Sequence, residues 1–157
     1  MRGTPLLRLL NPTEKLMKHR VIVAGGRNWR DRERVETVLR RAYAALSQGL
    51  LFAADGVKAI PDQPMFVHGA CPSGVDWIVR DYCLRMGWMQ DPHPADWEKH
   101  GKAAGPMRNQ RMVDRGAGLC LAFPTAESRG TWDCIRRAVA AGIETRIYPE
   151  LKREPVA

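Results

Sequence analysis

Three features are missing from this 157-residue sequence, and each absence excludes a class of protein. No apolar run approaches the roughly 20 residues that a membrane-spanning helix needs, so we expect no membrane partner. The four cysteines include no C-x-x-C pair and follow no secretory signal, so we expect reduced thiols and a cytoplasmic location. No Lys/Arg run long enough to mark a nucleic-acid-binding tail is present.

The start of the chain makes a poor signal peptide. Its leucine-rich segment is interrupted by Arg8 and stopped at Pro12. We therefore expect residues 1–19 to form an N-terminal arm, residues 20–150 a single α/β domain and residues 151–157 a frayed tail.

The net charge and the spacing of the Cys and His residues limit the classes of ligand that we expect this chain to bind. The formal net charge of +8 favours anionic partners such as nucleotides, nucleic acid or a phosphorylated metabolite, although a solvated basic surface would give the same count. A zinc site would have to use residues whose spacing matches no common zinc pattern, so we expect no metal and no cofactor. These residues are Cys71, His68, His93 and His100.

The most informative stretch runs from Met65 to Asp81. Residues 65–68 are apolar and predict a buried strand, residues 69–74 hold two glycines and a proline and predict a sharp turn, and helical spacing follows. Ser73 followed by Asp76 resembles a capping box. Glycines and first-turn amides suit such a turn to phosphate binding, and a βα connection without a ligand is the alternative.

A second glycine turn follows an apolar strand predicted at residues 21–24. Gly25 and Gly26 open this turn, and Asp31 is predicted to N-cap the next helix. The guanidinium of Arg27, beside the glycines, is suited to hold a phosphate or carboxylate with two hydrogen bonds; an ordinary surface arginine is the alternative.

Two later turns carry further candidate ligands. Arg108 and Asn109 fall in the first turn of a helix that we expect to begin at Pro106. Thr131 follows the apolar strand predicted at residues 119–123 and is expected to N-cap a helix or to face a phosphate.

Strands and helices therefore alternate along the chain, which predicts a Rossmann-like three-layer α/β sandwich with a mostly parallel sheet of about five strands. The loops at the carboxyl ends of such strands meet at one crevice. Trp97 is expected to stack on a base there or to pack in the core. The candidate ligand-binding residues are Gly25, Gly26, Arg27, Gly69, Ser73, Gly74, Trp97, Arg108, Asn109, Gly130 and Thr131.

Several short motifs together carry a family resemblance. They are Gly25-Gly26-Arg27, His68-Gly69, Ser73-Gly74-Val75-Asp76, Pro94-Ala95-Asp96-Trp97, Ala104-Gly105-Pro106, Arg108-Asn109 and Ser128-Arg129-Gly130-Thr131. With these motifs the chain resembles the SLOG superfamily and is most similar to its YspA-like (cpYpsA-related) branch, common in bacteria and their phages. The resemblance implies a Rossmann-like domain that binds a nucleotide or nucleotide-derived molecule, often as a homodimer.

Two alternative functions stay open. The Lonely-guy relatives are phosphoribohydrolases with a Pro-Gly-Gly-x-Gly-Thr-x-x-Glu pattern and a catalytic glutamate, but here Thr125 and Ala126 replace the two glycines and Cys134 stands at the glutamate position. Hydrolysis of an N-glycosidic bond would need another carboxylate, for which Asp76 is the best candidate and Asp133 a second. Nucleic-acid binding, as in DNA-processing relatives, is supported by the net charge but by no recognised motif.

Overall fold

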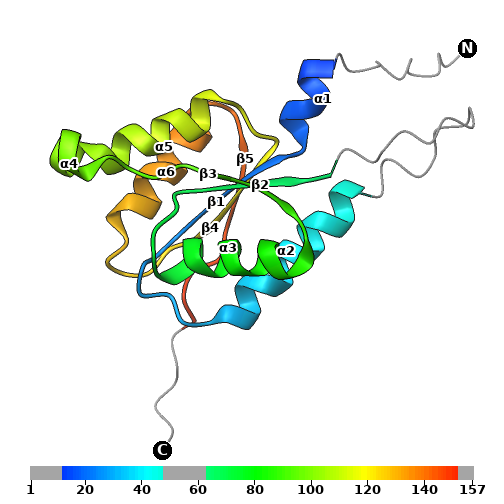
Figure 1. The fold of residues 1–157 in the computed structure, drawn as a ribbon, viewed down its shortest axis with the longest axis horizontal. Helices are drawn as coiled ribbons and strands as arrows, with labels where there is room; N and C mark the ends of the chain where they lie inside the picture. The colour runs from blue at the N-terminus through cyan, green and yellow to red at the C-terminus, as the bar shows by residue number, and fades with distance from the viewer. Residues whose placement is uncertain (1–11, 48–62, 152–157) are drawn as a thin grey trace, which may run out of the picture.

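Five parallel strands form the centre of the computed structural model, which describes residues 12–47 and 63–151 (Figure 1). Their order across the sheet is β3-β2-β1-β4-β5, and every neighbouring pair is parallel. The strands are β1 (Arg20–Gly25), β2 (Met65–His68), β3 (Met89–Pro92), β4 (Leu119–Phe123) and β5 (Glu144–Ile147). The predicted α/β class with a parallel sheet of about five strands is confirmed.

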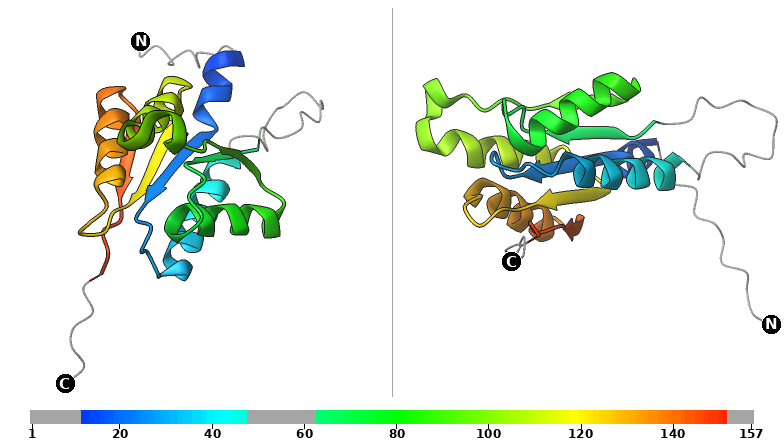
Figure 2. Two further views of the ribbon diagram at one scale, coloured as in Figure 1. Left: turned by 60° about the vertical axis from the view of Figure 1, so that its left-hand side comes forward. Right: turned by 90° about the horizontal axis from the view of Figure 1, so that it is seen from below.

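Helices cover both faces of the sheet and complete the three layers (Figure 2). One face carries α2 (Arg32–Ser47) and α3 (Gly74–Met86), and the other carries α5 (Ala104–Asp114) and α6 (Arg129–Ala140). The shorter elements are α1 (Pro12–Lys18), α4 (Trp97–His100) and the 3-10 helix η2 (Gly101–Ala103). Within the described ranges, no helix has the length and apolar content that a bilayer span requires.

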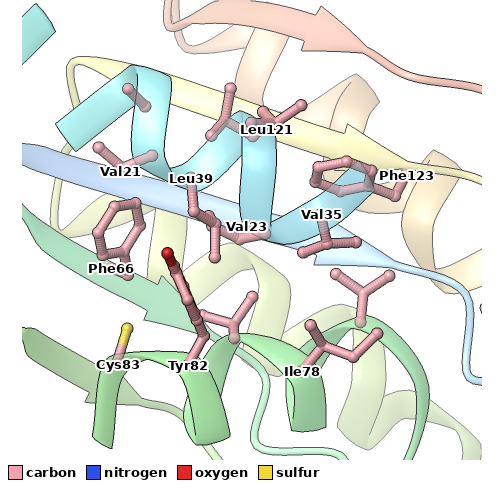
Figure 3. Close-up of a cluster of buried hydrophobic side chains, with 14 of the residues drawn as sticks. Val21, Val23, Val35, Leu39, Phe66, Ile78, Tyr82, Cys83, Leu121 and Phe123 are labelled. Atoms are coloured by element: carbon pink, nitrogen blue, oxygen red, sulfur yellow. The ribbon is translucent and has the colours of Figure 1, made fainter. Parts of the chain in front are cut away.

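Alternation of side chains along β1 divides the hydrophobic core into two layers. Val21 and Val23 pack with residues of α2 and α3, such as Leu39, in the cluster shown in Figure 3. Ile22 and Ala24 belong to the second layer, against α5 and α6. Because each fully buried aliphatic side chain stabilises the fold by about 1.5–3 kcal/mol, this alternation fixes which face of the strand each helix covers.

Several predicted boundaries are confirmed by local geometry. The strand predicted at residues 65–68 is β2. Asp31 Oδ1 accepts a hydrogen bond from the Arg34 amide at 3.1 Å, as expected of an N-cap. The helical spacing predicted after the turn at residues 69–74 belongs to α3, which ends at Gly87 with φ 67°.

Other predictions need correction or fall outside the described ranges. Helix α5 begins at Ala104 rather than at Pro106, because η2 leads directly into it. Most of the predicted tail at residues 151–157 lies outside the described residues. The same holds for residues 1–11 of the predicted arm, whose remainder holds α1.

Candidate functional site

A pocket of about 500 Å³ opens at the carboxyl edge of the sheet, where the strand order reverses between β1 and β4. This reversal is the place where ligands bind in open α/β sheets. The structure brings most of the candidate residues together there, namely Gly25, Gly26, Arg27, Gly69, Asp76, Trp97, Arg108, Asn109, Gly130 and Thr131. Ser73 and Gly74 do not line the pocket.

The glycines of the first turn let neighbouring loops pack closely. A Cβ on Gly25 would lie 2.2 Å from the Val75 side chain, and one on Gly26 would lie 2.6 Å from Thr125. Gly74 has φ +66°, and a Cβ there would lie 2.1 Å from the Gly26 carbonyl oxygen. That oxygen also accepts a hydrogen bond from the Val75 amide at 3.3 Å. These glycines therefore let the β1–α2 turn pack closely against the start of α3 and against Thr125.

Two backbone amides of the β2–α3 turn donate hydrogen bonds to side chains of the protein. The Ala70 amide donates to His68 Nδ1 at 3.1 Å, and the Cys71 amide donates to Asp76 Oδ2 at 3.2 Å. The predicted capping box is wrong, because Ser73 makes no side-chain cap hydrogen bond and the Asp76 carboxylate turns to Cys71 instead. Asp76 is buried at the pocket wall. Burial and the nearby Asp76 carboxylate raise the pKa of the Cys71 thiol, which therefore stays protonated at neutral pH.

Arg108 is buried and joins two loops beneath the pocket. Its Nη1 donates to the Gly69 carbonyl oxygen and, at 3.5 Å, to that of His93, while its Nε donates to Asn109 Oδ1 at 3.0 Å. A Cβ on Gly69 would lie 2.0 Å from Arg108 Nη1, so only glycine leaves room for the guanidinium. Two of the three guanidinium nitrogens of Arg108, Nε and Nη1, thus already donate to protein atoms rather than to a ligand.

Asn109 links this region to α6. Its Nδ2 donates to the Gly130 carbonyl oxygen at 3.1 Å and to Asp133 Oδ2 at 3.0 Å. Although burial raises the pKa of Asp133, hydrogen bonds from Arg137 and Asn109 bring it below its usual value. Asp133 is therefore ionised and already paired.

The start of α6 forms the opposite wall of the pocket. Thr131 is buried at the third position of the helix, so its predicted N-cap role is wrong; Ser128 is the N-cap. Ser128 Oγ accepts from the Thr125 amide at 2.8 Å and donates to the Thr125 carbonyl at 3.0 Å. Gly130 is exposed, and a Cβ there would meet nothing within 4 Å, so this part of the wall is open.

Four exposed cationic side chains line the pocket: Arg27, Lys102, Arg129 and Arg136. Within residues 12–47 and 63–151, no hydrogen bond or ion pair of 4 Å or less engages any of the four side chains. Three carboxylates also line it, Asp76, Asp133 and Glu127, and the first two already accept hydrogen bonds. The pocket therefore carries a surplus of uncompensated positive charge, which favours an anion.

Three of these cations, Lys102, Arg129 and Arg136, were not among the ligand-binding residues predicted from the sequence, although Arg129 stands in one of the motifs of the family resemblance. Arg129 and Arg136 are seven residues apart and so fall on one face of α6, a spacing that was available in the sequence. Lys102 lies in the 3-10 helix η2, which no pattern in the sequence predicted. Among the described residues, no group of three or more His, Cys, Asp or Glu side chains is placed to hold a metal ion.

Comparisons with known proteins identify the family of the chain. Residues 19–100 match the model of a family described as YspA, cpYpsA-related SLOG family. The chain is also similar to the Gene 61 protein of Mycobacterium phage D29, with 40% identity over 129 residues that cover 79% of this chain and 91% of the phage protein. No solved structure gives a significant match.

Proposed function

Because the chain belongs to the YspA, cpYpsA-related SLOG family, we propose that it binds a nucleotide or nucleotide-derived ligand in the pocket between β1 and β4. The observation that carries the proposal is the meeting of four cations, one of them Arg27, in one pocket without ion-pair partners among the described residues. A bound phosphate would gain charge-assisted hydrogen bonds there without breaking existing ion pairs.

In this proposal the phosphate lies at the start of α6. Arg129 and Arg136 supply the charge, and the open position at Gly130 lets the phosphate approach the helix N-terminus, where the helix dipole favours an anion. The Asp76 carboxylate accepts hydrogen bonds from sugar hydroxyls. Arg108 and Asn109 hold the pocket walls in place through the hydrogen bonds described above.

We further propose that the protein acts as a homodimer in the cytoplasm of a bacterial cell or a phage-infected host. The family resemblance supports this assembly, and so do the exposed apolar side chains of Trp132 and Val139 on α6 and of Ile147 on the edge strand β5. Light scattering of the purified protein would test the dimer.

Calorimetric titration with a panel of nucleoside mono- and diphosphates and nucleotide sugars tests the proposed binding. We expect at least one member to bind with a dissociation constant in the micromolar range, as is common for small anionic metabolites. Folded protein that binds no member of the panel would contradict the proposal.

The buried Asp76 carboxylate at the pocket wall favours a second candidate function, hydrolysis of the N-glycosidic bond of a nucleotide. If this function is correct, incubation with nucleoside monophosphates releases free base. Asp76→Asn should then lower turnover by about 100-fold or more, since general acid–base catalysis contributes about 10²–10⁴-fold. Unchanged turnover in the variant would remove Asp76 from any catalytic role.

A further inference from the structure

Trp97 presents an exposed aromatic ring at the mouth of the pocket. It lines the pocket, yet 47% of its surface is exposed. It is the first residue of α4, whose N-cap Asp96 accepts a hydrogen bond from the Lys99 amide at 3.0 Å. A Cβ on Gly105 would lie 3.2 Å from Cη2 of the indole. The ring is therefore held at its edge and is not enclosed by the core.

The guanidinium of Arg27 lies over this ring, with Cζ 5.3 Å from the ring centroid. The Arg27 backbone packs closely against Gly74, where a Cβ would lie only 2.6 Å from the Arg27 Cα. The side chain, in contrast, is exposed and has no hydrogen-bond or ion-pair partner in the described part of the chain. An exposed cation–π contact changes an equilibrium by about two- to fivefold, so a better stacking group can replace the guanidinium.

We propose that the face of Trp97 covered by Arg27 is the binding site for the base of the ligand, and that Arg27 occupies it only while no base is bound. The inference rests on the proposed nucleotide-binding function and narrows the ligand class. The ligand combines an aromatic nitrogen heterocycle with an anionic group, which excludes base-free sugar phosphates as preferred ligands.

The relative strength of the two contacts supports this exchange. Stacking of a base on an aromatic side chain changes affinity by about five- to 150-fold, which exceeds the contribution of an exposed cation–π contact. A base therefore displaces the guanidinium. The displaced guanidinium of Arg27 stays at the pocket wall and adds its charge to that of Arg129 and Arg136 beside the anionic group.

Calorimetric titration of the full chain with AMP and with ribose 5-phosphate tests the base site. AMP is expected to bind the wild-type protein at least about tenfold more tightly, because only AMP can stack. Trp97→Leu should weaken AMP binding by about twentyfold and change the affinity for ribose 5-phosphate by no more than about twofold. Trp97→Phe, which retains an aromatic ring, should recover part of the AMP affinity.

Trp77→Leu is a matched control. Trp77 is 42% exposed, and the Arg32 guanidinium lies 5.3 Å from the centroid of its ring, but Trp77 is on α3 and does not line the pocket. Its replacement should leave the affinities for AMP and ribose 5-phosphate unchanged. AMP should likewise quench tryptophan fluorescence in Trp77→Leu but not in Trp97→Leu.

Arg27→Ala tests whether the guanidinium covers the base site. Adenosine carries no phosphate, so loss of the positive charge does not weaken its binding, and its affinity should rise about threefold once no guanidinium has to be displaced. An affinity for adenosine that does not rise would overturn this part of the inference.

Different results would overturn the base site at Trp97 and nucleotide binding by the pocket. Equal binding of AMP and ribose 5-phosphate, or equal effects of Trp97→Leu and Trp77→Leu, would overturn the base site while nucleotide binding itself stands. Folded wild-type protein that binds neither AMP nor any other member of the nucleotide panel would overturn the proposed function.

Discussion

Gly74→Ala is expected to lower the free energy of unfolding by about 4 kcal/mol, combining left-handed backbone strain with overpacking. Gly74 has φ +66°, and the new Cβ would lie 2.1 Å from the Gly26 carbonyl oxygen and 2.6 Å from the Arg27 Cα. Both neighbours are backbone atoms, so the contact between the β1–α2 turn and α3 has to open. Urea unfolding followed by circular dichroism measures the loss.

Gly87→Ala separates the strain from the collision. Gly87 has almost the same backbone angle, φ +67°, but a Cβ there meets nothing within 4 Å. We expect this variant to lose only about 1 kcal/mol, the cost of the left-handed conformation for alanine. Similar losses in Gly74→Ala and Gly87→Ala would show that close packing of the two turns does not contribute to stability.

The sequence predicted the three central strands β1, β2 and β4 well because buried parallel strands are short apolar runs, a signal that lies within a few neighbouring residues. The meeting of the loops at one edge also followed from topology, since parallel strands place all their carboxyl ends together. The family resemblance agreed with both, and the match over residues 19–100 confirms it.

The partners of polar side chains could not be predicted in the same way. Ser73 and Asp76 have the spacing of a capping box, but the Asp76 carboxylate bonds to the Cys71 amide, a choice set by how the turn folds against Arg108. Arg108 lies in a helix beside Asn109, and nothing local indicates that its guanidinium reaches the Gly69 carbonyl, 39 positions earlier. Such partners depend on tertiary packing and are visible only in the structure.

The arginines that are free to contact a ligand could not be predicted either, because a surface arginine and a ligand-binding arginine look alike in a sequence. The structure distinguishes them by their surroundings. Arg137 already pairs with Asp133, whereas its neighbour Arg136 lines the pocket and has no partner within hydrogen-bond or ion-pair distance in residues 12–47 and 63–151. Arg136 is consequently the better candidate for contact with an anionic ligand.

The double variant Arg129→Ala/Arg136→Ala is expected to weaken AMP binding by about 100-fold, since each lost charge-assisted hydrogen bond to phosphate costs about tenfold in affinity. Both side chains are exposed, so the variant should unfold at the same urea concentration as the wild-type protein. Isothermal titration calorimetry at fixed ionic strength measures the change, because the strength of such contacts falls with added salt.

Arg41→Ala/Arg80→Ala provides the control for net charge. These two arginines are also exposed, form no hydrogen bond or ion pair with other described residues and lie outside the pocket. Removing them lowers the net charge by the same amount but should change AMP affinity by less than about twofold, because neither side chain lines the pocket and salt weakens the attraction between solvent-exposed charges. Equal losses in the two double variants would mean that the whole basic surface attracts the anion, as a nucleic-acid-binding protein would require. A loss confined to Arg129→Ala/Arg136→Ala would place the anion at the start of α6.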